Sequence, residues 1–193
     1  LDQQNIDKII SNYLSKNIKF SEENIFAVKL SLLDTLGCIY NASTYEDPMR
    51  FATRNVYGGN TNPFKVLGGM QSSNEIARYF SILTRWFDYN DTFLAKEWAH
   101  PSDNIGTAFA YFINHKEKNI SQFLQSIIQM YEIQGSLALG TSLNKKGYDH
   151  VFYVKLASGA VYSSLLSDKN TESISRTVNN VLQDGVNLRS YRQ

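Results

Sequence analysis

Apolar residues recur at helical spacing along most of the chain, and this periodicity restricts the fold more than any other feature. The first stripe has the spacing i, i+3, i+4, i+7 and i+8, and it comprises Ile6, Ile9, Ile10, Tyr13 and Leu14. Further helices are expected to begin near Ser21, Ser72, Ser121, Asp149 and Thr171. Because alternating strand patterns hardly occur, the sequence predicts an all-α helical bundle.

Several of these segments carry more specific predictions. The stripe after Ser21 is rich in Val, Ile and Leu, and we expect this second helix to be deeply buried. Pro48 suits the first turn of a shorter helix that stops at Gly58-Gly59, and residues 60–69 are expected to form turns around a short extended piece. Another helix should start at Ser102 or Asp103, and its small residues, among them Gly106, would let a neighbouring helix approach closely.

The length of 193 residues is enough for one domain, 1–193, with a sizeable core. The 19 basic and 18 acidic residues are interspersed, so the charge pattern indicates neither nucleic-acid nor anionic-membrane binding. The single cysteine, Cys38, lies in an apolar run, where we expect a small buried hydrophobic residue. No uninterrupted apolar stretch reaches the roughly 18 residues of a membrane span, and no export signal opens the chain, so the cytoplasm is the expected location.

The segment Trp86–Asn104 gathers carboxylates, a hydroxyl, an amide and a histidine beside large aromatic residues. If the preceding helix continues through it, Asp88, Asp91 and Thr92 fall at i, i+3 and i+4 and present their polar groups together. His100 precedes a proline, which disfavours helix at this position, so we expect it on a loop that could return over the aspartates. An imidazole held by a carboxylate suits proton transfer near neutral pH.

Purely structural roles for these residues stay open. Asp, Asn, Thr and Ser also gather at helix ends to cap backbone groups. A metal site from Asp88, Asp91 and His100 is disfavoured, because further nitrogen or sulfur ligands are few, with only three histidines and one cysteine in the whole chain. His150 follows Asp149 at a helix start, where a role in capping or packing fits the sequence as well as a role in catalysis. His115 lies in a polar stretch and is expected at the surface.

No glycine pattern of a dinucleotide site or a phosphate loop and no G-x-S-x-G motif occur, which argues against nucleotide cofactors and serine hydrolysis. The stretches Arg-Trp-Phe-Asp-Tyr-Asn-Asp-Thr (85–92) and Glu-Trp-Ala-His-Pro-Ser-Asp-Asn (97–104), however, closely resemble the signature of the MmgE/PrpD dehydratases. Further similar stretches follow in the family's order at residues 33–38, 131–139, 147–158 and 184–192. Members of this family have a large helical domain and a smaller lid domain, so the chain resembles their N-terminal helical part, without the lid.

The resemblance implies an activity. It implies a cofactor-free and metal-free dehydration of 2-methylcitrate, and possibly of citrate, to 2-methyl-cis-aconitate or cis-aconitate, as in the methylcitrate cycle of propionate metabolism. It further implies a homodimer, in the cytoplasm or in the mitochondrial matrix of a eukaryote. Two rivals from the same family are cis-aconitate decarboxylation and epimerisation of a diacid. A rival of another class is a helical module that binds acids or a partner without turnover.

The resemblance also implies roles for single residues. We expect His100 to transfer a proton, Asp88 to orient His100 or share that work, and His150 to contact the substrate or carry a second proton. The expected substrate-binding residues are Asp91, Thr92, Arg189 and Arg192. The two arginines fit this role because a guanidinium can hold a carboxylate through two parallel hydrogen bonds. Lys96 and Lys155 are weaker candidates for the same role.

Overall fold

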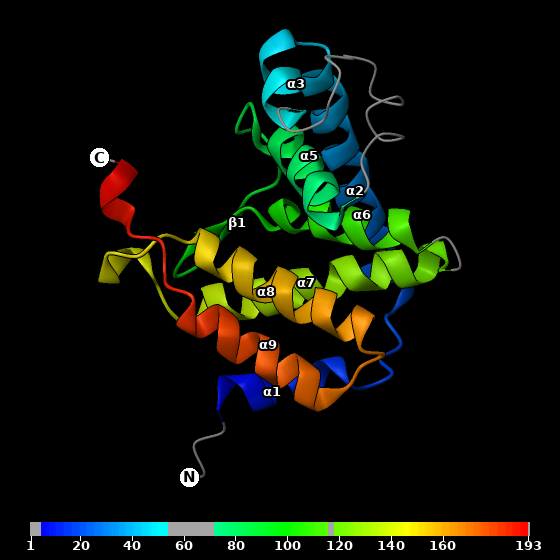
Figure 1. The fold of residues 1–193 in the computed structure, drawn as a ribbon, viewed down its shortest axis with the longest axis vertical. Coiled ribbons are helices and arrows are strands. Elements are labelled where there is room, and N and C mark those ends of the chain that lie inside the picture. Colours follow the sequence, from blue (N-terminus) through cyan, green and yellow to red (C-terminus); the bar gives the residue numbers. More distant parts are fainter. Residues whose placement is uncertain (1–4, 54–71, 116–117, 193) are drawn as a thin grey trace. The chain divides into compact units, whose positions relative to one another are not determined.

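A computed structural model describes residues 5–53, 72–115 and 118–192. Over these residues the chain forms helices joined by short loops, so the predicted all-α fold class is confirmed (Figure 1). The α-helices are α1 (Ile6–Leu14), α2 (Glu22–Ser43), α3 (Glu46–Ala52), α5 (Ser73–Arg85), α6 (Ile105–Asn114), α7 (Ile120–Gly140), α8 (Val151–Leu166) and α9 (Thr171–Gln183). The short 3-10 helices are η1 (Pro101–Asn104), η2 (Asn144–Lys146) and η3 (Arg189–Arg192). The expected stop at Gly58-Gly59 and the expected turns of residues 60–69 lie outside the described residues.

The chain divides into two compact units. Unit 1 comprises Leu1–Ser21, Thr92–Pro101 and Ile128–Gln193, and unit 2 comprises Glu22–Asp91 and Ser102–Ile127. The first two turns of α7 thus belong to unit 2 and the remainder of α7 to unit 1. The expectation of one domain over residues 1–193 stays a prediction.

In unit 1, α1, α8 and α9 pack against one another (Figure 1). Of the predicted apolar face of α1, Ile10 and Leu14 are buried, whereas Ile9 is 50% exposed. Asp7 of α1 is buried too, and its Oδ2 accepts hydrogen bonds from Ser175 Oγ at 2.5 Å and from Asn179 Nδ2 at 3.1 Å, both in α9. These hydrogen bonds, above all the one from Ser175, lower the pKa of the Asp7 carboxyl. The charged carboxylate is therefore the form that joins α1 to α9.

A two-stranded antiparallel sheet in unit 1 is an element that the apolar periodicity does not predict. Strand β1 (Phe93–Leu94) pairs with β2 (Trp98–Ala99), with Phe93 opposite Ala99 and Leu94 opposite Trp98. Each strand has only two residues, so the sequence holds no alternating pattern long enough to indicate it. The hairpin is anchored because Phe93 and Ala95 pack on an apolar cluster that includes Ala138, Phe152 and Tyr153.

In unit 2, α5 packs against α2, α3 and α6. It begins near Ser72, as predicted, with a capping box in which Ser72 Oγ accepts a hydrogen bond from Glu75 N at 3.3 Å and Ser72 N donates one to Glu75 Oε2 at 3.2 Å. The buried face of α5 carries Ile76, Phe80 and Leu83 at helical spacing, with Ile76 and Leu83 almost fully enclosed. The capping signal and the periodicity thus locate this helix correctly.

Gly106 confirms the expected close approach between helices in unit 2. A Cβ added at this position would lie 2.7 Å from the carbonyl oxygen of Ala77 in α5, which is closer than real Cβ contacts. The backbones of α5 and α6 therefore approach each other at a point where only a glycine fits.

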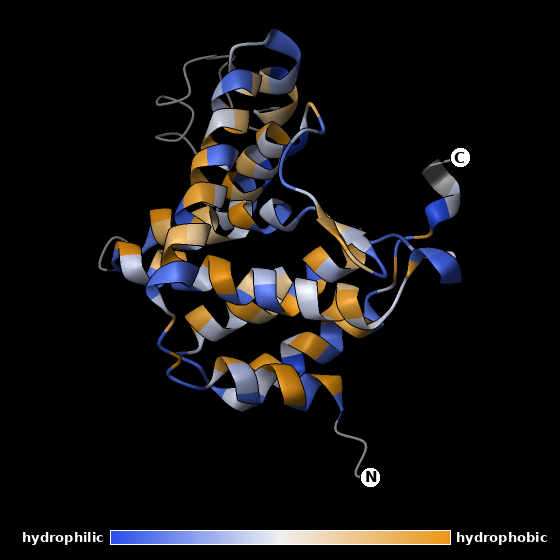
Figure 2. Cartoon of the chain, turned by 180° about the vertical axis from the view of Figure 1, so that it is seen from behind, coloured by the Kyte–Doolittle hydropathy of each residue, from blue (hydrophilic) through white to orange (hydrophobic). Residues whose placement is uncertain are grey.

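The deep burial expected for the second helix is wrong. In α2, Val28, Cys38 and Ile39 are buried, but Leu33 is 67% exposed and Leu36 is 41% exposed. Other large apolar side chains of α2 that are exposed are Phe26, Leu30 and Tyr40. Apolar residues recur along the whole helix (Figure 2). A helix that is apolar all round does not reveal from its sequence which face has a partner.

The length and apolar composition of α2 would also let it cross a membrane, a property that no other described helix has. The mean hydropathy of its most apolar 18 residues is 1.3, although charged residues such as Lys29 and Asp34 interrupt the apolar run. One side of α2 packs on α3 and α5, and a core helix of a compact unit passes the same test. Cys38 of α2 is buried, as expected, and burial raises the pKa of its thiol.

Candidate active site

The polar segment Trp86–Asn104 does not continue the preceding helix. Helix α5 ends at Arg85, and Asp88 adopts a left-handed backbone conformation with φ 59°. Aspartate tolerates this conformation better than most residues, and a residue in it ends a helix. The predicted alignment of Asp88, Asp91 and Thr92 on one helical face is therefore wrong. Asp88 and Asp91 belong to unit 2, whereas Thr92, which is exposed, belongs to unit 1.

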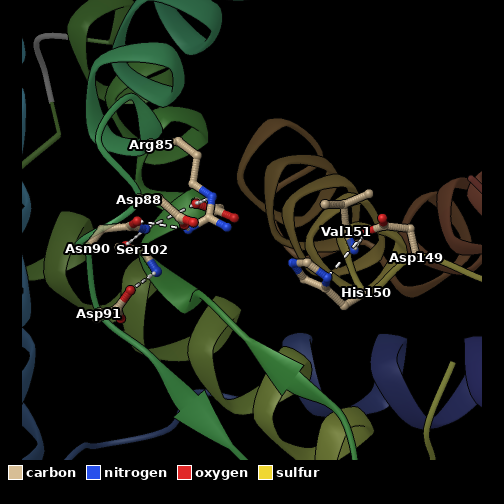
Figure 3. A network of polar contacts seen from close by, with 9 residues as sticks. Arg85, Asp88, Asn90, Asp91, Ser102, Asp149, His150 and Val151 are labelled. Carbon is tan, nitrogen blue, oxygen red and sulfur yellow. Dashed lines mark hydrogen bonds and ion pairs between the residues drawn. The ribbon is translucent and has the colours of Figure 1, made fainter. Parts of the chain in front are cut away.

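Arg85 is the centre of a polar network in unit 2 (Figure 3). Its Nη1 lies 2.5 Å from Oδ1 of Asp88 and donates a hydrogen bond to Asn90 Oδ1 at 3.0 Å. Its Nε lies 4.0 Å from Oδ1 of Asp103. The Asp88 side chain is 72% exposed, so water screens this ion pair. A neighbouring cation thus faces Asp88, the aspartate expected to take part in proton transfer.

Asn90 and Asp91 connect this network to the segment that follows His100 in the chain. Asn90 donates hydrogen bonds from Nδ2 to Ser102 Oγ at 2.7 Å and to Asp103 Oδ1 at 3.2 Å. Asp91 Oδ1 accepts a hydrogen bond from Ser102 N at 3.0 Å. These bonds join the chain after α5 to the start of η1. Asp91 thus holds the start of η1 in place, and its expected contact with the substrate stays a prediction.

Two histidines that are fifty positions apart in the sequence lie near each other in unit 1. His100 directly follows β2, on the loop predicted from the proline after it, and His150 is the residue before α8. The centroids of the two imidazoles are 6.1 Å apart, and the ring planes are inclined by 52°. Both side chains are buried. The structure thus brings together the two histidines expected to be catalytic.

Trp98 and Arg189 complete this group, which we call the histidine cluster (Trp98, His100, His150 and Arg189). The indole of Trp98 has its centroid 3.9 Å from that of His150 and 5.9 Å from that of His100. The guanidinium carbon of Arg189 lies 5.4 Å from the centroid of the same indole. The Nη1 of Arg189 is buried and has no hydrogen-bond acceptor among the described residues. Because an unsatisfied buried donor is costly, this atom fits the expected role in binding a carboxylate.

Asp149 is the carboxylate that faces His150. It is fully buried, and its Oδ1 lies 3.2 Å from Nδ1 of His150 (Figure 3). The same oxygen accepts a hydrogen bond from Val151 N at 3.1 Å, so Asp149 also caps the first turn of α8. The sequence pattern indicated Asp149 only as the start of a helix. Its position directly before His150 in the sequence was a signal that could have suggested the contact.

Backbone hydrogen bonds join two segments of the histidine cluster, the one that carries His150 and the one that carries Arg189. The loop before α8 and the segment before η3 run beside each other, with an antiparallel bridge between Tyr148 and Leu188. Asp149 N donates to the carbonyl of Asn187 at 2.8 Å, and Arg189 N donates to the carbonyl of Gly147 at 3.0 Å. The backbones of the segments that carry His150 and Arg189 are thereby joined.

Glu97 links the strand that carries Trp98 to the loop that leads to His150. Its carboxylate is almost fully buried, and Oε2 accepts hydrogen bonds from Asn144 N at 2.7 Å and from Ser142 Oγ at 3.2 Å. Its Oε1 accepts a hydrogen bond from Trp98 N at 3.3 Å. The sequence places Glu97 and Trp98 in a family motif but predicts no role for either residue.

The remaining candidates lie elsewhere. Lys96 donates a hydrogen bond to the carbonyl of Gly140 at 3.3 Å, and Lys155 forms an ion pair with Asp184 at 2.6 Å, so both cations are engaged. Arg192 belongs to η3, and its side chain lies outside the part of the chain that the structure describes. Over the described ranges, no three His, Cys, Asp or Glu side chains gather as metal ligands.

The fold and the histidine cluster together define an all-α domain with two buried imidazoles and a guanidinium around one indole. A family model described as the MmgE/PrpD N-terminal domain matches residues 9–193. The chain therefore belongs to the MmgE/PrpD family.

Curated relatives agree with this assignment. The chain is 33% identical to a probable 2-methylcitrate dehydratase of Saccharomyces cerevisiae, over 99% of this chain and 40% of that protein. It is 34% identical to the mitochondrial 2-methylcitrate dehydratase of Yarrowia lipolytica, over 97% of this chain and 39% of that protein. It is 38% identical to the 2-methylcitrate dehydratase of Escherichia coli K12, over 83% of this chain and 36% of that protein. The matches thus cover about two fifths of the length of these relatives.

Proposed function

We propose that the full-length protein containing this chain is a hydro-lyase that dehydrates 2-methylcitrate, and possibly citrate, to the corresponding cis-aconitate without a cofactor. The relatives named 2-methylcitrate dehydratase support the reaction class. The proposal is assigned to particular residues because His100 and His150 lie close together and both contact Trp98, over which lies Arg189 with its buried Nη1.

The chemistry of dehydration fits these groups. A proton must leave the carbon beside a carboxylate while the hydroxyl group departs from the neighbouring carbon with a second proton. One neutral and one protonated imidazole can accept the first proton and donate the second. A guanidinium can hold a substrate carboxylate through parallel hydrogen bonds and stabilise the charge that develops on it.

We assign His100 to proton transfer and His150 to substrate contact or to the second proton. Asp149 would orient the His150 imidazole, because its oxygen faces Nδ1. Arg189 and Arg192 would bind carboxylates, Asp91 would bind the substrate, and Thr92 would contribute a hydrogen bond. Asp88 would orient His100 or share its work, as the family resemblance implies.

A substrate comparison tests this proposal. The full-length protein is given 2-methylcitrate, citrate and cis-aconitate in turn, with and without a chelator. We expect ultraviolet absorbance of an unsaturated acid to rise with 2-methylcitrate, no effect of the chelator, and no carbon dioxide from cis-aconitate. Carbon dioxide release would assign the protein to the decarboxylase activity, and turnover of none of these acids would refute the dehydratase.

We also propose that the protein acts as a homodimer in the cytoplasm, or in the mitochondrial matrix if its source is a eukaryote. The mitochondrial relative of Yarrowia lipolytica supports the second location. Sedimentation equilibrium of the full-length protein tests the dimer, and a mass equal to one chain over the measured concentration range would contradict it.

A further inference from the structure

One indole touches every charged or titratable side chain of the histidine cluster. The Trp98 and His150 rings lie 3.9 Å apart between centroids at an inclination of 41°, and Trp98 and His100 meet edge to face at 90°. Arg189 lies over the Trp98 ring at 5.4 Å, within the roughly 6 Å of a cation–π contact. All four residues belong to unit 1, so each of these contacts lies within one compact unit.

Trp98 is itself held on both sides. It pairs with Leu94 across the two-stranded sheet, and its backbone N–H donates to the buried carboxylate of Glu97. Through Glu97 its strand is bound to Asn144 in the loop that leads to His150. A rigid ring fixed in this way sets where the His150 imidazole and the Arg189 guanidinium can lie.

We propose that Trp98 is a positioning residue of the active site, which fixes the distance between the His150 imidazole and the Arg189 guanidinium. This inference rests on the proposed function, in which His150 and Arg189 contact the same substrate molecule. The carboxylate that Arg189 binds then determines which carbon of the substrate faces the imidazole. Misplacement by about 1 Å can lower a rate by about 100-fold, so such a residue matters although it need not touch the reacting atoms.

Kinetics of two substitutions test the proposal. In the full-length protein, Trp98→Leu removes the aromatic face, whereas Trp98→Phe keeps a ring. We expect Trp98→Leu to raise KM, because Arg189 loses the ring that supports it. The same variant should lower kcat, because the His150 imidazole also loses this contact. The combined loss in kcat/KM should be about 10- to 100-fold. Trp98→Phe should retain much more of the wild-type kcat/KM than Trp98→Leu. A purely structural defect would not produce this difference between the two variants.

Trp86→Leu is the matched control. Trp86 is the other tryptophan of this chain, and it contacts Phe51 in unit 2, with ring centroids 5.5 Å apart. We expect kcat and KM of this variant to stay near the wild-type values. Wild-type kcat and KM in Trp98→Leu would overturn the proposal. Equal losses in Trp98→Leu and Trp98→Phe would do so too.

A spectroscopic measurement tests the same contact without turnover. The emission lost in Trp98→Phe is the contribution of Trp98, and an imidazole in contact with an indole alters that emission. His100, His150 and Arg189 are the groups against the indole. We expect His150→Gln to change the Trp98 emission, because it removes the ring whose centroid lies 3.9 Å from that of the indole.

The two measurements separate the possible failures. If the wild-type protein turns over no tested acid, the dehydratase proposal fails, and the emission alone decides whether Trp98 and His150 are in contact. A Trp98 emission that is unchanged in His150→Gln would overturn the proposed positioning role.

Discussion

At the scale of single residues, Glu97 should support the histidine cluster through the strand and loop that it joins. Its buried carboxylate accepts hydrogen bonds from Ser142, Asn144 and Trp98, and hydrogen bonds to charged groups contribute about 1.5–3 kcal/mol each. We expect Glu97→Ala to lower the free energy of unfolding by at least about 2 kcal/mol. Chemical denaturation of the full-length protein measures this change.

Glu172→Ala is the control for this prediction. Glu172 is also a hydrogen-bonded carboxylate, but it is exposed and forms a surface ion pair with Arg176. Such pairs contribute about 0–1 kcal/mol, so its removal should change the free energy of unfolding by less than about 1 kcal/mol. Similar losses in the two variants would mean that the buried contacts of Glu97 have no special effect.

The residues that the sequence predicted and the residues that it missed differ in kind. His100 stands out from the residues alone, because it lies on a loop among carboxylates and aromatic residues, whereas His150 was expected in the site through the family resemblance. Both lie in one cluster. Trp98 and Glu97 have side chains that any core can use. Their roles depend on contacts with residues more than forty positions away, and no local pattern encodes such contacts.

At the scale of elements, Gly106 sets how closely α5 and α6 pack. In Gly106→Ala the new methyl group would meet the Ala77 carbonyl at 2.7 Å, which is backbone and cannot move aside easily. Overpacking of this kind costs about 1–3 kcal/mol, so we expect the free energy of unfolding to fall by that amount. Denaturant titration checks it.

For Gly37→Ala, in the same unit, we expect the opposite effect on the free energy of unfolding. Gly37 is also a helical glycine, but an added Cβ would meet nothing within 4 Å. Replacing an unconstrained helical glycine by alanine stabilises a protein by about 0.5–1 kcal/mol. If Gly106→Ala were as stable as Gly37→Ala, the close approach of α5 and α6 would be contradicted.

The junction of α1 and α9 should respond to acid. The pKa of Asp7 is lowered in the folded state, so its carboxylate stabilises the fold above the ordinary carboxyl pKa, and this stabilisation is lost as the pH falls through the lowered value. We therefore expect the thermal unfolding midpoint to fall more in the wild type than in Asp7→Asn between about pH 6 and pH 3. Parallel decreases in the two proteins would contradict the role of this carboxylate.

Helices were easier to predict than their surroundings. The starts of α5 and α9 follow from Ser72 with its capping partner and from the polar residues before Thr171, because these signals are local. The exposure of α2 could not be predicted, because its apolar residues surround the helix and only a partner decides which of them is buried. The end of α5 depends on the left-handed conformation of Asp88, which aspartate permits but does not require.

At the scale of the whole molecule, residues 9–193 match the N-terminal domain model of the MmgE/PrpD family, and the matches cover 36% to 40% of the length of the curated relatives. Within the chain, the histidine cluster lies entirely in unit 1 and the Arg85 network entirely in unit 2. The central claim is that dehydration depends on the histidine cluster. A histidine outside this cluster therefore offers the sharpest comparison.

His115 is that histidine. It belongs to unit 2, where its ring stacks on Tyr111 with centroids 4.0 Å apart. The most direct test is the kcat for 2-methylcitrate of His100→Asn and of His115→Asn in the full-length protein, at equal thermal stability. General acid–base catalysis contributes about 10²- to 10⁴-fold, so we predict a loss of at least about 100-fold in His100→Asn and none in His115→Asn. A wild-type kcat in His100→Asn, or an equal loss in His115→Asn, would contradict the claim.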